Sequence, residues 1–144
     1  MREVTELTGG CACGGVRFKA TGRIAGGAVC YCNVCQKIGA GGPNYTMSMT
    51  HAEIETTGNT QVFRNPGGTG EVIERIYCQD CGVHLYAQGG GNSHLLRIKA
   101  GGLDDPTLYQ PTLQCWTSQA KPWHVLNPAL PAFPKNPTGS AGEK

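Results

Sequence analysis

The chain has 144 residues, enough for one domain, and its 12 Lys and Arg residues against 10 Asp and Glu leave a net charge of +2. That charge is too small for a nucleic-acid surface or a polybasic membrane patch, so we expect neither partner. The 22 glycines and 9 prolines disfavour a helical bundle and favour a turn-rich β fold. The core of such a fold needs disulfides or a bound metal to stabilise it, and the 8 cysteines can provide either.

The first residues of the chain, from Met1 to Leu7, hold no apolar core of signal-peptide length. No later stretch approaches the roughly 20 apolar residues of a membrane span. We therefore expect a cytoplasmic protein, in a reducing compartment where thiols stay free or bind metal.

Short runs rich in β-branched and aromatic residues predict a mainly β fold with antiparallel connections. The expected strands are 16–20, 28–31, 45–49, 61–64, 72–77, 83–87, 95–100 and 112–116. Residues 50–53 match a capping box and predict one helical turn. We expect one domain over residues 5–127 and a Pro/Gly-rich tail over 128–144, which drapes over the body at first and is disordered at its end.

Seven of the eight cysteines fall into three tight groups. The groups are Cys11-x-Cys13, Cys30-x-Cys32-x-x-Cys35 and Cys78-x-x-Cys81. Cysteines this close can turn their sulfurs toward one ion across a tight turn, and zinc takes sulfurs about 2.3 Å away in a tetrahedron. Gly14, Gly15 and Gly82 follow the groups and supply the backbone freedom that such turns require.

The numbers of cysteines suggest how the groups combine. The two outer groups together offer four sulfurs, which complete a closed site, whereas joining either to the middle group gives five. The middle group then keeps three ligands and an open position, which is typical of a catalytic zinc. We therefore predict two zinc ions per chain. Cys11, Cys13, Cys78 and Cys81 hold the structural ion, and Cys30, Cys32 and Cys35 hold the catalytic one.

Two alternatives concern these cysteines. A disulfide framework is disfavoured, because the first residues predict no secretory signal and odd-numbered groups pair badly. A redox motif at Cys78 and Cys81 would usually precede a helix, whereas residues 83–86 predict a strand.

Cys115 stands apart and is expected to be a small buried hydrophobic residue. The remaining candidate ligands are expected to be surface or satisfied core residues; they are His51, His84, His94 and His124.

Several motifs resemble the glutathione-dependent formaldehyde-activating enzyme family, to which centromere protein V belongs. They are GGCACGGVRF at 9–18, CYCNVC at 30–35, YCQDCG at 77–82, KAGGLDDP at 99–106 and KPW at 121–123. The resemblance therefore spans most of the chain and includes all seven grouped cysteines. This chain carries Tyr31 and Gln36 where family members usually have a histidine and a basic residue.

The resemblance implies a mainly β fold related to a small zinc-binding factor that acts on Rab GTPases. It also implies the same division of zinc ligands and a carbon–sulfur lyase reaction. That reaction forms or breaks S-hydroxymethyl-glutathione, so that glutathione is the co-substrate of formaldehyde. A zinc ion that favours the thiolate form of the substrate and holds it beside the aldehyde would supply most of the catalysis.

Glutathione has two carboxylates, so its site needs cations. The candidates are Lys37, Arg75, Arg97 and Lys99, each of which could instead solvate a strand edge. The glycine-rich run 39–43 either lets the substrate approach the zinc closely or is a plain connector. The competing hypothesis is a non-catalytic zinc module that binds a protein partner, in which a fourth protein ligand closes the middle group. The oligomeric state is left open.

Overall fold

The computed structural model describes residues 3–68, 70–90 and 94–137. Over these residues the chain forms one sheet of eight strands in the order β1-β2-β3-β7-β6-β5-β4, with β8 also paired to β2. The strands are β1 (Val4–Gly10), β2 (Arg17–Cys30), β3 (Asn44–Thr57), β4 (Thr60–Pro66), β5 (Val72–Cys78), β6 (His84–Gly89), β7 (Leu95–Lys99) and β8 (Leu113–Cys115). The helical elements are α1 (Asn33–Ile38) and the 3-10 turns η2 (Ala100–Gly102), η3 (Pro106–Leu108) and η4 (Thr117–Gln119).

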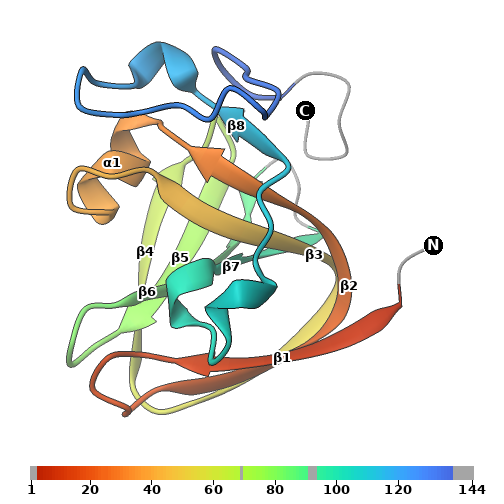
Figure 1. Ribbon diagram of the computed structural model, residues 1–144. Coiled ribbons are helices and arrows are strands. Elements are labelled where there is room, and N and C mark those ends of the chain that lie inside the picture. The colour runs from red at the N-terminus through yellow and green to blue at the C-terminus, as the bar shows by residue number, and fades with distance from the viewer. Residues whose placement is uncertain (1–2, 69, 91–93, 138–144) are drawn as a thin grey trace.

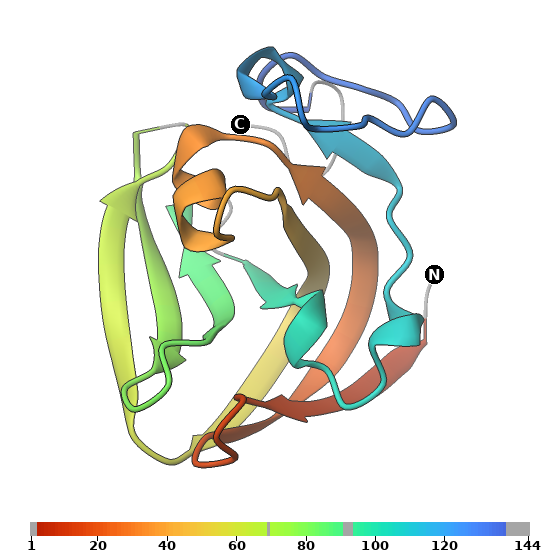
Figure 2. The same ribbon diagram turned by 60° about the vertical axis from the view of Figure 1, so that its left-hand side comes forward.

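The expected mainly β fold with antiparallel connections is confirmed. Each pair of neighbours from β1 to β4 is antiparallel, and β8 runs parallel to the end of β2. The sheet is strongly curved, so that β4 and β5 stand opposite β2, and α1 lies at one end of the curve (Figures 1 and 2). This curvature gives the sheet an inner face on which residues from distant strands can meet.

Two expected strands are parts of one longer strand. All but the outermost residue of each of the runs 16–20 and 28–31 belongs to β2, which continues through the glycine-rich stretch between them. Irregular register against β3 between Thr21 and Arg23 and between Ile24 and Gly26 absorbs the interruption. Gly27 is required for close approach rather than for a turn, because a Cβ there would lie 2.4 Å from the Gln110 carbonyl oxygen.

The expected helical turn does not form, and the helix that does form was not expected. Residues 50–53 lie inside β3, where half-buried and exposed residues alternate with the period of a strand. Conversely, α1 at Asn33–Ile38 was not expected, because its six residues are too few to show a helical period. The strand β1 was missed as well; it pairs with β2 and buries Leu7.

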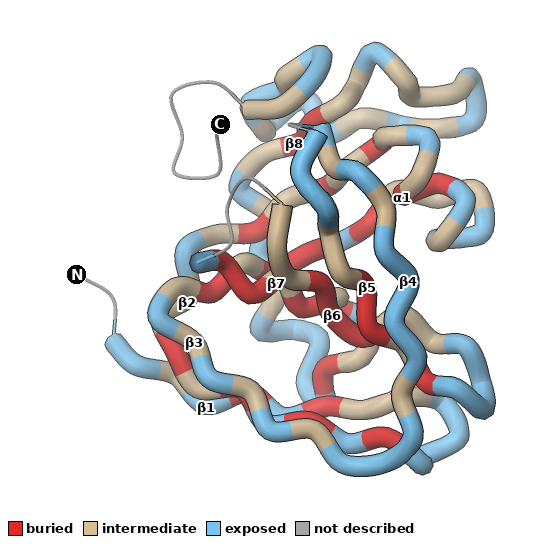
Figure 3. The backbone as a smooth tube through the Cα atoms, turned by 180° about the vertical axis from the view of Figure 1, so that it is seen from behind, coloured by how far each residue is buried: buried red, intermediate tan, exposed pale blue. Residues whose placement is uncertain are grey.

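The hydrophobic core is formed by buried side chains of β1, β2, β3, β5, β6 and β7, whose buried segments are red in Figure 3. Its largest fully buried side chains include Leu7, Met47, Met49, Leu85 and Ile98. By contrast, most of β4 is exposed, since it forms one end of the sheet order. Along β3 and β7 the core residues alternate with residues that face the other side of the sheet, so the core covers one face of these two strands and leaves the other face to different side chains.

The chain after β8 folds back along that strand and runs beside α1 (Figure 1). Backbone hydrogen bonds join Gln114 to Pro131 and Phe133, and Trp116 to Lys135. Trp116 Nε1 also donates to Asn136 Oδ1 at 2.9 Å. Residues 128–137 are therefore held against the body, and the expectation of a disordered end falls on residues 138–144, outside the described residues.

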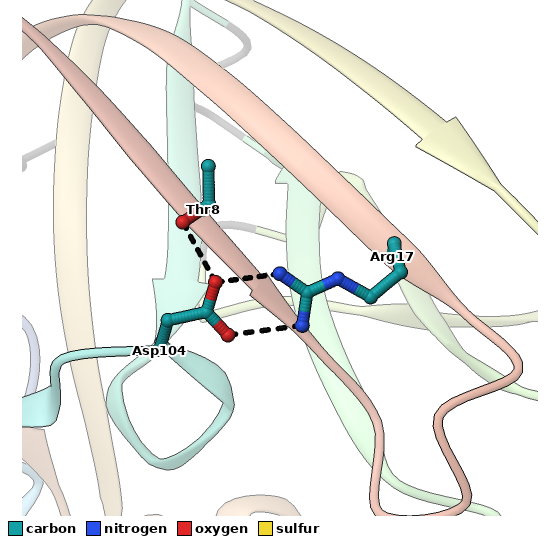
Figure 4. A network of polar contacts seen from close by, with 3 residues as sticks. All are labelled: Thr8, Arg17 and Asp104. Carbon is teal, nitrogen blue, oxygen red and sulfur yellow. Dashed lines mark hydrogen bonds and ion pairs between the residues drawn. The ribbon is translucent and has the colours of Figure 1, made fainter.

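A polar clamp fixes the segment of the 3-10 turns to the β1–β2 ribbon (Figure 4). The Arg17 guanidinium donates to both carboxylate oxygens of Asp104, at 2.9 and 2.5 Å, and Thr8 Oγ1 donates to the same carboxylate at 2.7 Å. These bonds hold the pKa of Asp104 at about 2. Because the pair is exposed, we expect it to set geometry more than stability.

Among the described residues, no helix has the length and apolar character needed to cross a membrane.

Candidate metal centres and adjoining cavity

The first cysteine cluster joins two hairpins that are distant in sequence. The four Sγ atoms of Cys11, Cys13, Cys78 and Cys81 lie within 4.8 Å of one another. Cys13 Sγ is 3.5 Å from Cys11 Sγ and 3.8 Å from Cys78 Sγ. A tetrahedron of sulfurs about 2.3 Å from a zinc ion has edges of about 3.8 Å, so this donor set fits the metal.

The backbone around this cluster is shaped to hold thiolates. Val16 N–H donates to Cys11 Sγ at 3.2 Å, and the N–H groups of Asp80 and Cys81 each donate to Cys78 Sγ at 3.4 Å. Gly14 and Gly82 follow the two motifs with φ of +80° and +76°, a conformation that favours glycine. Each motif thus ends in a tight turn with a glycine in the left-handed conformation, in line with the prediction from Gly14 and Gly82.

The second cluster forms where β2 passes into α1. Cys30 is the last residue of β2, Cys32 is the N-cap of α1, and Cys35 lies in the first turn. Their Sγ atoms also lie within 4.8 Å of one another. Cys32 Sγ accepts the Cys35 N–H at 3.3 Å, which holds the Cys32 thiol beside the first turn of α1. The thiols of Cys30 and Cys32 hydrogen-bond to Cys35 and lower its pKa, so the cluster favours a thiolate.

A cavity of about 470 Å³ adjoins the second cluster, and all three of its cysteines line it. This volume lies within the usual range of about 300–1,000 Å³ for small-molecule sites. The walls come from the ends of β2 and β3, the inner face of β5 and β7, the β4–β5 connection, and the segment after β8. Asn136 and Pro137 complete the lining, so the C-terminal segment is part of the wall.

Three cations face this cavity from the sheet. Arg75 lies on β5, and Arg97 and Lys99 lie on β7. Ala87 of β6 pairs with Arg75 on one side and with Arg97 on the other, which places all of these side chains on one face of the sheet. Among the described residues the cavity lining contains no Asp or Glu. The cavity is therefore suited to an anionic ligand.

The cations are held by neutral groups. Arg75 Nε donates to Asn65 Oδ1 at 2.7 Å, Arg97 Nη1 to the Gly89 carbonyl at 3.1 Å, and Lys99 Nζ to Thr46 Oγ1 at 2.9 Å. Burial lowers the pKa of Arg97, and it lowers the pKa of Lys99 to about 8. Since no described carboxylate pairs with them, a bound anion would relieve an unfavourable concentration of positive charge.

Two sequence candidates do not reach the cavity. Lys37 lies exposed on α1 and is not among the lining residues, because it faces away from the side on which Cys32 and Cys35 lie. The glycine-rich run 39–43 is also outside the lining. His124 Nδ1 accepts the Lys121 N–H, and its Nε2 donates to the Gly41 carbonyl at 2.7 Å. The run is thus a connector, pinned by the segment that follows η4.

Tyr31 and Gln36 both support α1 instead of lining the cavity. Tyr31 is buried and packs edge-to-face on His124, with ring centroids 5.1 Å apart. The buried Gln36 donates through Nε2 to the carbonyls of Tyr31 and Gln119, at 2.6 and 2.8 Å. Gln36 therefore ties the start of α1 to the segment after β8.

His84 departs from the expectation that each histidine is exposed or satisfied. Both of its ring nitrogens are buried without a hydrogen-bond partner among the described residues. It pairs with Tyr77 beside an irregularity in the β5–β6 register, and so shares the inner face with Arg75. Burial lowers its pKa to about 3, so the imidazole is neutral at ordinary pH.

This environment predicts a pH-dependent effect of replacing His84. The unfolded chain takes up a proton near pH 6.5. The folded chain excludes that proton until about pH 3, so the wild type loses stability as the pH falls through this window. The stability advantage of His84→Leu over the wild type should grow by about 2 kcal/mol between pH 7 and 5.

Urea unfolding of the zinc-loaded proteins at several pH values measures the advantage. The control is His94→Leu, at an exposed histidine, which should follow the wild type. Identical pH dependence in His84→Leu and the wild type would contradict a buried, neutral His84.

The site therefore defines a class of β protein with two thiol clusters, each of which could hold a metal ion. A cationic cavity adjoins the three-thiol cluster. A comparison of the sequence with protein families places it further: residues 6–119 match the model of the glutathione-dependent formaldehyde-activating enzyme, and the chain belongs to this family. The expected resemblance is confirmed.

A search of solved structures shows a related fold. A crystal structure of a protein from Rhodobacter sphaeroides has a TM-score of 0.56, with 14% sequence identity over 88% of this chain and 99% of that one. At this identity the likeness concerns the fold alone. No curated protein matches the chain.

Proposed function

We propose that this protein is a zinc-dependent enzyme of the carbon–sulfur lyase class that acts on S-hydroxymethyl-glutathione or a closely related anionic thiol adduct. The observation that carries the proposal is the three-thiol cluster at a cavity whose described lining holds three cations and no carboxylate. Membership of the formaldehyde-activating family supports the choice of glutathione and formaldehyde.

The two clusters have different roles in this proposal. Cys11, Cys13, Cys78 and Cys81 would hold a structural zinc, because four thiolates complete its coordination. The second cluster, formed by Cys30, Cys32 and Cys35, would hold a catalytic zinc. When bound there, zinc supplies a position at which a substrate thiol is held as its thiolate.

Arg75 and Arg97 would bind the carboxylates of the substrate. Both guanidiniums reach the cavity from positions on β5 and β7 that flank Ala87 of β6, and each has further N–H groups besides the one that donates to a neutral partner. Two carboxylates on one ligand match two such cations. Binding the ends of glutathione at the sheet would leave its thiol to meet the cysteine cluster that lines the same cavity.

Lys99 is placed to handle the proton of the reaction. When the thiolate attacks formaldehyde, a sulfur–carbon bond forms, the carbonyl π bond breaks, and the oxygen takes up a proton. With a pKa of about 8, the Lys99 ammonium can donate that proton near neutral pH, and it can take it back in the reverse direction. The bond to Thr46 Oγ1 would keep Lys99 Nζ oriented during this exchange.

Two thiol clusters with the spacing of metal ligands suit a reducing compartment, and we propose the cytoplasm. The function itself is tested by NMR exchange spectroscopy on purified protein with glutathione and formaldehyde. We expect the exchange between free reactants and S-hydroxymethyl-glutathione to accelerate strongly. If the rate equals that in buffer, the formaldehyde assignment fails. In that case a closed, four-ligand middle site would favour the alternative of a zinc module for a protein partner.

The cationic wall makes a specific kinetic prediction. Arg97→Gln removes one charge from the cavity and should raise the KM for glutathione by about 10-fold to 100-fold, since a charge-assisted hydrogen bond contributes about 1.5–3 kcal/mol. The kcat should change much less, because the thiol cluster is intact.

Steady-state rates at varied glutathione concentration measure this effect. The matched control is Arg64→Gln, at an exposed arginine of β4 outside the cavity. An unchanged KM in Arg97→Gln, or an equal rise in Arg64→Gln, would exclude Arg97 from substrate binding.

A further inference from the structure

Cys115 lies directly opposite a member of the second cluster. In the parallel ladder of β2 and β8, Cys30 and Cys115 are Cα partners. The Tyr31 N–H donates to the Cys115 carbonyl at 3.0 Å, which fixes the register just beyond this pair. Two cysteines 85 positions apart in the sequence are therefore held side by side by backbone hydrogen bonds.

The geometry of this pair suits a disulfide. Residues paired across neighbouring strands point their side chains to the same face of the sheet. Strands lie about 4.8 Å apart, and the Cα atoms of disulfide-bonded cysteines lie about 4.4–6.8 Å apart. A bond between Cys30 and Cys115 thus needs little movement of the backbone.

The two thiols also share an environment. Both line the cavity, and Cys115 is buried with 6% of its surface exposed. The two thiols also form a hydrogen bond with each other. Cys115 nevertheless lies outside the group of three sulfurs that fall within 4.8 Å of one another. It therefore contacts the cluster through Cys30 without belonging to the predicted set of ligands.

We propose that Cys30 and Cys115 form a redox pair, in which a disulfide between them withdraws Cys30 from the metal cluster and releases its ion. With only Cys32 and Cys35 left, the site would keep two protein ligands, too few for firm zinc binding. Oxidation would therefore switch the second cluster off and leave the four-thiol cluster intact.

A small peroxide is the oxidant of this step. The Cys30 thiolate attacks one peroxide oxygen, which forms a sulfenic acid and releases hydroxide. The Cys115 thiol then attacks the Cys30 sulfur, so that the sulfur–sulfur bond forms, the sulfur–oxygen bond breaks and water leaves. In total two thiols are oxidised by two electrons and one peroxide is reduced to two waters. An added dithiol reverses the bond by exchange.

The experiment treats the zinc-loaded full chain with hydrogen peroxide. Released zinc is followed with a chromogenic chelator, and free thiols are alkylated before non-reducing peptide mass spectrometry. We expect a peptide linked through Cys30 and Cys115, and the loss of about one of two bound zinc ions, restored by dithiothreitol and zinc. A disulfide joining Cys32 to Cys35, with Cys115 alkylated, would overturn the proposal.

Variants separate the thiol from its packing. Cys115→Ala should release zinc several-fold more slowly and with less recovery, because no resolving thiol is present. Leu113→Ala, on the same strand and also lining the cavity, should oxidise like the wild type. Equal rates and recovery in Cys115→Ala and the wild type would overturn the proposal. Mass spectrometry detects the linked peptide without any measurement of catalysis, so a failed formaldehyde assay would not affect this result.

Discussion

Replacing Cys81 by alanine should unfold most of the protein or lower its melting temperature severely. The four-thiol cluster joins the hairpin after β1 to the hairpin after β5, which are about 65 residues apart. Structural zinc contributes about 10 kcal/mol or more to the folding of small domains, comparable with the total stability of about 5–15 kcal/mol. With three thiols left, the ion should be bound more weakly, and much of that contribution should be lost.

Thermal unfolding and zinc content of the purified variant measure this effect. Asp80→Ala is the matched control, since Asp80 lies in the same turn and its side chain is exposed. It should change the free energy of unfolding by less than about 0.5 kcal/mol. A Cys81→Ala variant that melts with the wild type and keeps two zinc ions would show that the cluster does not hold the fold together.

Cys32→Ala should abolish activity and leave the fold nearly intact. The substitution removes one of three thiols from the second cluster, so a catalytic ion should no longer be held in position. It also removes the N-cap hydrogen bond to Cys35 N–H, which costs about 1 kcal/mol. For a chain of this size we expect a melting temperature lower by about 4 °C.

The rate of glutathione–formaldehyde exchange and the thermal unfolding curve should be measured on the same preparation. Ser48→Ala provides a control that alters the cavity wall without touching a thiol, and it should retain activity. Equal losses of thermal stability in Cys32→Ala and Cys81→Ala would contradict the division between a catalytic and a structural cluster.

The sequence predicted those features of the site that are local along the chain. Cysteines two or three positions apart stay close in any fold, so the three groups could be recognised directly. Combining Cys11 and Cys13 with Cys78 and Cys81 needed only a count of ligands, and the structure brings these four thiols together. The mainly β fold followed from short β-branched runs and abundant glycine.

What the sequence did not predict depends on register between distant strands. Cys115 meets Cys30 because β8 pairs in parallel with the end of β2, and no local pattern announces that pairing. Likewise, His84 reaches the inner face through an irregularity in the β5–β6 ladder. The four candidate cations could not be ranked from the sequence. Arg75, Arg97 and Lys99 reach the cavity because of where β5 and β7 lie in the sheet, whereas Lys37 is exposed on α1.

The most direct test of two unequal metal sites is optical titration of the cobalt-substituted protein with glutathione. Cobalt reports its ligands through visible absorption, so each cluster is observed separately from activity. We predict two cobalt ions per chain, of which one changes its spectrum when glutathione is added and the other does not. A single bound ion, or two ions whose spectra both ignore glutathione, would contradict the account.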